Sequence, residues 1–156
     1  MFMGRVQRTY HGRDLRKGRV SEPGTAYLVT TVTRNRQALF RDLQSARILV
    51  RSLRAESDNA TTLAFVVMPD HLHWLLQLID GVTLSGLMQR VKSASAHHIN
   101  RHLQLSGAVW QSGFHDHAVR TEEDLRQLAR YVVANPLRAG LVSKVGDYSH
   151  WDAIWL

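Results

Sequence analysis

The chain has 156 residues, enough for one domain with a substantial core and too few for two comfortable domains. The chain has no cysteine, so we expect neither disulfides nor thiolate metal sites. Its opening segment is polar and no apolar run is long enough to span a bilayer, so we expect no signal peptide and no membrane association. These features favour a cytoplasmic protein. Twenty lysines and arginines against thirteen acidic residues give a formal net charge of +7, which favours a polyanionic partner, nucleic acid first, although a basic surface kept only for solubility also fits.

The first segment, residues 1–20, is predicted to be a basic flexible arm with a single acidic residue, Asp14. An arm of this composition is a candidate for gripping DNA phosphates, and a merely solvated terminus fits the same composition. Residues 21–156 are expected to form one domain, since no linker or repeat divides them. The basic residues of the arm are Arg5, Arg8, Arg13, Arg16, Lys17 and Arg19.

The first half of the domain is predicted to contain a strand, a helix and two further strands. Residues 26–33 are rich in β-branched and aromatic side chains, which is typical of a strand. Residues 42–56 carry apolar side chains at helical spacing together with a stripe of arginines. Two apolar runs, 63–68 and 71–78, flank a Pro-Asp break, which favours neighbouring antiparallel strands.

The second half is predicted to add a helix, a short strand and a last helix. Apolar spacing indicates a helix over 84–102, and a short strand is expected to end at Arg120. Thr121 can cap a helix that ends near Asn135, because Pro136 disfavours helical geometry in the residue before it. The order of elements predicts an α+β fold, a ferredoxin-like antiparallel sheet with helices, plus an added C-terminal helix.

Two histidines stand one residue apart in the strand predicted over 71–78. Side chains alternate across a strand, so His71 and His73 share one face while Leu72 and Trp74 lie on the other, apolar face. Successive side chains on one face are roughly 7 Å apart, close enough for two imidazoles to bind one metal ion. The alternative interpretation is a pair of half-exposed polar residues on an open sheet face.

The last predicted helix can supply further polar groups. At about 100° per residue, Tyr131 and Asn135 lie one turn apart on the border of its apolar stripe. A helix over the histidine face would place the phenol and the carboxamide beside the same ion. Alternatively, Tyr131 is a boundary tyrosine with a packed ring, and Asn135 is a helix end before proline. The apolar stripe comprises Leu125, Leu128, Ala129 and Val132.

Six segments distributed along the chain form an ordered set. In chain order they are PDHLHWLLQL, MQRVKSASAHHIN, WQSGFHDHAVR, TEEDL, RYVVANPLRAGLV and GDYSHWDAIWL. This set resembles one group of proteins, the REP-associated tyrosine transposases among the HUH single-tyrosine transposases. The resemblance runs from about residue 26 to the C-terminus. It implies an enzyme that cleaves and rejoins single-stranded DNA through a 5′-phosphotyrosine intermediate.

The resemblance also implies roles for single residues. Tyr131, on the added C-terminal helix, matches the nucleophile of the group. His71 and His73 match the two histidines of its motif, and Asn135 matches the position of the third metal ligand. The implied metal is Mg²⁺ or Mn²⁺, which would polarise the scissile phosphate. Ligand softness alone would favour zinc at a two-histidine site, and we follow the resemblance here.

The implied partner is single-stranded DNA of short palindromic repeats folded as hairpins, with adjacent unpaired bases read by the protein. The chain would work as a monomer or homodimer and would be associated with the nucleoid when bound to DNA. Lys92, Arg120 and Arg138 join the six basic residues of the arm as predicted DNA contacts.

Other histidines and aromatic residues are not assigned to the site. His98 and His102 have the i, i+4 spacing of a metal pair but lack the acid of the zinc-protease pattern, so we expect them on the surface. His117 could reach the active-site face, although structural hydrogen bonding is favoured. Trp110 and Phe114 are expected in the core rather than stacked on bases.

Two alternative functions stay open at this point. The first is a non-catalytic hairpin-binding protein on the same fold. The second is a histidine-dependent nucleotide phosphohydrolase, because His-Leu-His resembles part of a histidine-triad motif. That motif needs a third histidine, and Leu75 stands at the next alternate position.

Overall fold

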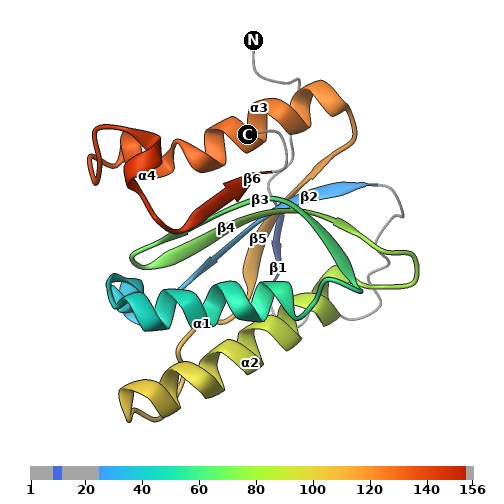
Figure 1. Ribbon diagram of the computed structural model, residues 1–156. Helices are drawn as coiled ribbons and strands as arrows, with labels where there is room; N and C mark the ends of the chain where they lie inside the picture. The colour runs from blue at the N-terminus through green and yellow to red at the C-terminus, as the bar shows by residue number, and fades with distance from the viewer. Residues whose placement is uncertain (1–8, 12–24, 154–156) are drawn as a thin grey trace.

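The structure, a computed structural model, describes residues 9–11 and 25–153 and places the chain in three layers (Figure 1). A six-stranded sheet with strand order β1-β5-β2-β4-β3-β6 forms the middle layer, and every pairing in it is antiparallel. Helices α1 and α2 cover one face of the sheet, and α3 covers the other (Figure 1).

The sheet and the layers that cover it are built from six strands, four α-helices and three 3₁₀ turns within the described residues. The strands are β1 (Thr9–His11), β2 (Ala26–Val32), β3 (Ala60–Met68), β4 (His71–Leu78), β5 (Phe114–Val119) and β6 (Trp151–Ala153). The α-helices are α1 (Leu43–Arg54), α2 (Leu84–Leu103), α3 (Glu122–Val133) and α4 (Asn135–Arg138). Single 3₁₀ turns are η2 (Arg34–Arg36), η3 (Leu39–Arg41) and η4 (Val145–Asp147).

The predicted α+β fold with a ferredoxin-like antiparallel sheet is confirmed. Its four central strands stand in the order β5-β2-β4-β3, and α1 and α2 are the two connections that cross one face. The predicted strand over 71–78 agrees with β4 at both ends. Thr121 caps α3 as predicted, with its hydroxyl accepting from the Asp124 backbone amide at 3.3 Å.

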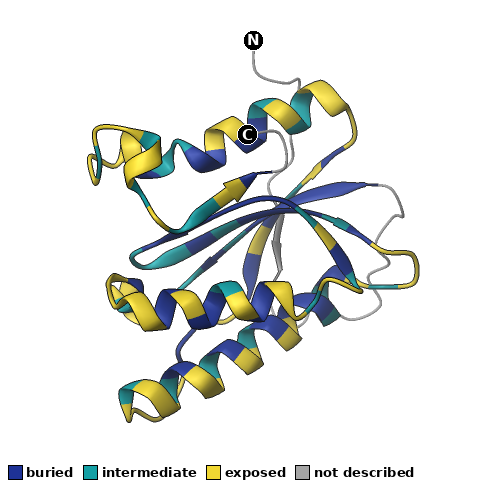
Figure 2. Ribbon diagram, viewed as in Figure 1, coloured by how far each residue is buried: buried dark blue, intermediate teal, exposed yellow. Residues whose placement is uncertain are grey.

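The core is divided between the two faces of the sheet, and the alternation of β4 decides which side chain enters which half. Leu72, Trp74, Leu76 and Leu78 are buried beneath α1 and α2, as predicted. Leu75 faces the other way and packs in the cluster that contains Leu128 and Val132 of α3. Figure 2 shows these buried strands between helices whose outward faces are exposed. Trp110 and Phe114 are buried in the α1–α2 half of the core, as expected.

The structure differs from the sequence prediction at both edges of the sheet and after α3. β1 and β6 were not predicted, and β1 pairs with β5 from within the segment expected to be an arm. The six basic residues of that arm lie outside the described residues, so the division into 1–20 and 21–156 stays a prediction. Helix α3 ends at Val133, close to the predicted end near Asn135, but the chain then forms a second short helix, α4, because Pro136 occupies its first turn, where a missing amide hydrogen is tolerated.

None of the described helices has the length and apolar character needed to cross a membrane.

Candidate metal and nucleophile site

The two histidines of β4 stand at the end of the sheet where β3 turns into β4. The turn at Pro69 and Asp70 is held by the segment that follows β2: the Thr33 amide donates to the Asp70 carbonyl at 2.9 Å, and the Phe40 amide donates to the Pro69 carbonyl at 3.0 Å. The first residue of β4 is therefore fixed. His71 and His73 point to the face that α3 covers, the face of Leu75.

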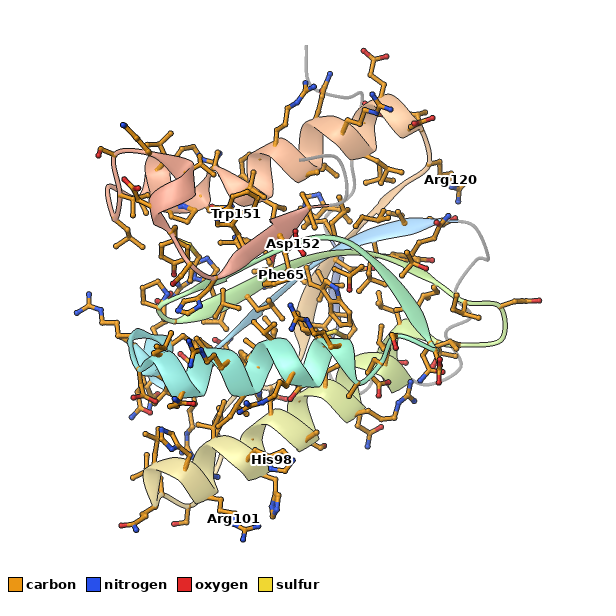
Figure 3. All side chains as sticks on the ribbon, in the orientation of Figure 1. Phe65, His98, Arg101, Arg120, Trp151 and Asp152 are labelled. Carbon is orange, nitrogen blue, oxygen red and sulfur yellow. The ribbon has the colours of Figure 1, made fainter. Side chains whose placement is uncertain are left out.

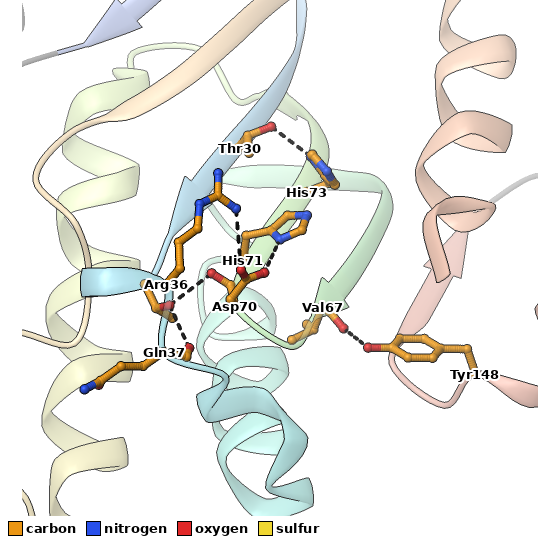
Figure 4. Close-up of polar contacts among 9 residues, drawn as sticks. Thr30, Arg36, Gln37, Val67, Asp70, His71, His73 and Tyr148 are labelled. Atoms are coloured by element: carbon orange, nitrogen blue, oxygen red, sulfur yellow. Dashed lines mark hydrogen bonds and ion pairs between the residues drawn. The ribbon is translucent and has the colours of Figure 1, made fainter. Parts of the chain in front are cut away.

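Both imidazole rings are anchored through the same ring nitrogen. His71 Nδ1 lies 2.7 Å from Asp70 Oδ1, and His73 Nδ1 lies 2.8 Å from the Thr30 hydroxyl (Figure 4). An ionised carboxylate only accepts hydrogen bonds, so Nδ1–H of His71 is the donor, and in the neutral imidazole Nε2 carries the lone pair. The ring centroids of the two histidines are 4.8 Å apart and the rings are nearly perpendicular. The pair therefore has the spacing and, at His71, the tautomer that metal binding requires.

Asp70 connects the histidine pair to an arginine. Its second oxygen, Oδ2, lies 3.4 Å from Nη1 of Arg36, whose side chain is 68% exposed. Burial alone would raise the pKa of Asp70, but the interactions with His71, its hydrogen bond first, and then those with Arg36 outweigh it and leave this pKa below its usual value. Asp70 is thus an anion at neutral pH.

Helix α3 carries the predicted nucleophile on the border of its buried stripe. Leu128, Ala129 and Val132 are buried against the sheet, whereas Tyr131 is 43% exposed. In Figure 1 α3 runs across the sheet so that its C-terminal end and α4 lie on the same side of the molecule as the β3–β4 turn. Helix α3 therefore covers the face of the sheet that carries the histidines.

Tyr131 and Asn135 are held by contacts at the end of α3. The Arg138 guanidinium carbon lies 3.9 Å from the centroid of the Tyr131 ring, and Arg138 Nη2 donates to the Tyr131 carbonyl at 2.9 Å. Asn135 Nδ2 donates to the carbonyls of Tyr131 and Val132, both at 3.2 Å. Because both partners are acceptors, the amide nitrogen must face them, and Oδ1 is left as the atom suited to bind a cation.

The donor set fits a metal that accepts nitrogen and neutral oxygen ligands. Among the residues that the structure describes, no three or more histidine, cysteine, aspartate and glutamate side chains gather into a metal site, so a site here would depend on a carboxamide as well as the two imidazoles. His71 and His73 would be two of the ligands and Asn135 the third. These assignments stay predictions.

The predicted DNA contacts fall in different places. Arg138 lies against Tyr131. Lys92 donates from Nζ to the carbonyls of Gln111 and Gly113 at 2.8 and 2.7 Å, so its ammonium holds a loop. Arg120 lies at the end of the sheet opposite to the β3–β4 turn, just before α3 (Figures 1 and 3).

Sequence reasoning missed three residues around the histidines. Asp70 directly precedes His71 in the sequence Pro69-Asp70-His71, and this acidic neighbour was the only one of the three that the sequence could have indicated. Nothing in the sequence indicated Thr30 or Arg36, because their positions depend on the register of β2 with β4, in which Thr30 pairs with His73. His102 is exposed, as expected, and its Nε2 lies 2.9 Å from Asp42 Oδ2, within hydrogen-bond distance.

Comparison with known proteins gives a consistent result. The family model described as "Transposase IS200 like" matches residues 23–135, well over half of the chain. The REP-associated tyrosine transposase of Escherichia coli (strain K12) is 26% identical over 127 residues, which cover 80% of this chain and 74% of that protein. The structure of a REP-associated tyrosine transposase bound to a REP hairpin is similar with a TM-score of 0.70 and 24% identity, covering 96% of this chain and 82% of that one. At this identity the structural likeness concerns the fold.

Proposed function

This chain belongs to the family of IS200-like transposases, and from that premise we propose that it cleaves and rejoins single-stranded DNA at hairpin-forming palindromic repeats through a covalent tyrosine intermediate. The observation that carries the proposal is the histidine pair on the face of the sheet covered by the helix of Tyr131. The net charge of +7 suits a polyanionic substrate. A hairpin is the ligand of the similar solved structure, which supports the choice of DNA.

In the proposed reaction Tyr131 is the nucleophile. Its phenolic oxygen gives its proton to solvent and forms a bond to the scissile phosphorus, the bond from phosphorus to the 3′ oxygen breaks, and that oxygen takes up a proton from solvent and leaves as a hydroxyl. The products are a 5′-phosphotyrosine and a free 3′-hydroxyl. The phosphodiester energy is kept in the new bond, so a 3′-hydroxyl of another strand can reverse the step without water or ATP.

The proposal includes a divalent cation, Mg²⁺ or Mn²⁺, held by His71, His73 and Asn135. When bound, the cation would neutralise charge on the scissile phosphate. The chain's own contribution is to hold the ligands: Asp70 and Thr30 orient the two imidazoles. Arg138 keeps the Tyr131 ring in place and adds a positive charge next to it.

The test is an incubation of the pure protein with a labelled hairpin oligonucleotide from repeats that flank its own gene, plus Mg²⁺ or Mn²⁺. We expect a protein–DNA adduct that survives denaturation and is lost in Tyr131→Phe and in His73→Ala. Arg130→Gln, on the exposed side of α3, is the control and should form the adduct as wild type does. An adduct that persists in Tyr131→Phe would contradict the proposal.

The same experiment separates the two alternative functions. A non-catalytic hairpin-binding protein would bind the oligonucleotide with equal affinity as wild type and as Tyr131→Phe, and neither would form an adduct. Turnover of free mononucleotides without an adduct would point to a phosphohydrolase. The choice between monomer and homodimer is made by sedimentation of the same sample with and without DNA.

A further inference from the structure

Two histidines of β5 lie on the same face of the sheet as the histidine pair of β4. His115 and His117 stand on either side of Asp116. Phe114 is buried in the α1–α2 half of the core, and Asp116, two residues on, is buried as well. Alternation along the strand therefore turns His115 and His117 to the opposite face, where Val119 packs in the cluster of α3.

The register of the sheet places His115 level with His73. Thr30 of β2 pairs with His73 on one side and with His115 on the other. Neighbouring strands lie ~4.8 Å apart, so the Cα atoms of these two histidines, two strands apart, are separated by roughly 10 Å. His117 pairs with Leu28, one step farther from the β3–β4 turn. His115 is therefore the histidine of β5 that lies opposite a candidate metal ligand.

The surface between these two histidines is accessible. His115 is exposed and Thr30 is half-buried, whereas Leu28 and Val119, farther along β2 and β5, are buried in the cluster of α3. The Thr30 hydroxyl, 2.8 Å from Nδ1 of His73, gives this surface a polar floor. The two imidazoles thus flank an open, polar stretch of sheet that can accommodate a phosphate group.

Tyr131 approaches the histidine pair from the other side. Helix α3 packs on β3 and β4, and α4, which follows it, packs on β3. In the strand order β5-β2-β4-β3 the histidine pair therefore stands between the nucleophile helix and β5. Attacking and leaving oxygens lie roughly in line in phosphoryl transfer. A phosphate at the histidine pair that is attacked from the β3 side directs its 3′ oxygen toward β5.

We infer that His115 is a further catalytic residue, which delivers the proton that the 3′ oxygen takes up when its bond to phosphorus breaks. Imidazole is the side chain most often used for such transfers. The inference rests on the proposed function and deepens it, because it names the group that handles the leaving oxygen.

The proton balance of the two directions follows from the exposure of His115. In cleavage the protonated imidazole gives its proton to the 3′ oxygen, becomes neutral and takes a new proton from solvent. In rejoining the neutral imidazole accepts the proton of the incoming 3′-hydroxyl while that oxygen bonds to phosphorus. The bond from phosphorus to Tyr131 then breaks, and the phenolic oxygen takes up a proton from solvent.

A change of leaving atom tests this role directly. Two hairpin oligonucleotides are compared that differ only at the scissile bond, which carries the natural 3′ oxygen in one and sulfur in the other. Sulfur leaves as a thiolate and needs no proton, since thiols are far more acidic than alcohols. The readout is the single-turnover rate of adduct formation with Mn²⁺ and saturating protein, so that a change in affinity does not enter. His115→Ala should be at least ~100-fold slower than wild type on the oxygen substrate and within about threefold of it on the sulfur substrate.

Two further variants separate proton transfer from other effects. His97→Ala removes an exposed imidazole from α2, on the other side of the sheet, and should match wild type on both substrates. His115→Gln keeps a hydrogen-bond donor without a transferable proton and should be as slow as His115→Ala on the oxygen substrate. A normal rate of either His115 variant on the oxygen substrate would overturn the inference, and so would equal slowing of His115→Ala on both substrates, which a merely structural role predicts.

The same rates distinguish a failure of the inference from a failure of the proposed function. If wild type forms the adduct and His115→Ala shows no preference for the sulfur substrate, the inference fails and the proposed function survives. If wild type forms an adduct with neither substrate, both fail.

Discussion

Asp70 gives the sharpest prediction about the histidine pair, because one charged hydrogen bond of 2.7 Å fixes both the tautomer and the orientation of His71. Asp70→Ala removes the acceptor, so His71 can rotate and can carry its proton on Nε2. Loss of such an outer partner typically lowers metal affinity about 10- to 100-fold. Asp70→Asn keeps an oxygen that accepts from Nδ1 but loses the charge, so its affinity should lie between those of Asp70→Ala and wild type.

The assay is Mn²⁺ binding followed by electron paramagnetic resonance, with nitrogen chemical shifts of His71 as a second readout. Wild type and Asp70→Asn should show Nδ1 protonated, whereas Asp70→Ala should show a mixture of tautomers. Asp58→Asn removes an exposed carboxylate at the turn before β3 and is the charge-matched control. The ion pair with Arg36 is exposed and should contribute little, so Arg36→Gln should leave Mn²⁺ affinity within about twofold. If Asp70→Ala binds Mn²⁺ as tightly as wild type while His73→Ala does not, the reasoning is wrong.

Three further predictions concern the stability of the fold. Burial raises the pKa of the Tyr148 phenol. The contribution of the neutral phenol to the free energy of unfolding is therefore present below pH ~10 and is lost as the pH rises through the folded-state pKa. Tyr148→Phe removes the hydrogen bond to the Val67 carbonyl and should lower the free energy of unfolding, measured in urea at pH 8, by about 1 kcal/mol. It should also reduce the loss of stability at alkaline pH, and an unchanged loss would contradict this. Burial, and then the charge of Arg47, lower the pKa of His150 below 6.5. The contribution of the neutral imidazole to the free energy of unfolding is therefore present above pH 6.5 and is lost as the pH falls through the folded-state pKa. Arg47→Gln should raise the pKa measured for His150 by NMR titration, but not fully to 6.5, and a fall would refute the assigned cause. Thr121→Ala removes the cap of α3 and should lower the free energy of unfolding by about 1 kcal/mol, whereas Thr121→Ser should retain it.

Strong local patterns are the reason why much of the fold could be predicted from the sequence. The alternation around His71 and His73 defined β4, and the Thr121 cap with its acidic first turn located the start of α3. The edge strands β1 and β6 have three residues each, too few for an alternation to be recognised. Pro136 was correctly predicted to follow the end of α3, whereas the short helix α4 that begins beside it was not predicted.

Contacts that depend on register could not be predicted from the sequence. Thr30 reaches His73 because β2 and β4 pair with these two residues opposite each other, 43 positions apart in the chain. Arg36 reaches Asp70 because the turn after β2 folds back with left-handed residues. The candidate metal ligands were thus visible in the sequence, whereas the groups that orient them were not.

The most direct test of the central claim is to identify the residue that becomes attached to DNA. The adduct formed by wild type with a hairpin oligonucleotide would be digested with nuclease and protease, and the peptides would be sequenced by mass spectrometry. We predict one modified peptide, with a nucleotide linked through its 5′ phosphate to the phenolic oxygen of Tyr131. Attachment to any other residue, or through a 3′ phosphate, would contradict it.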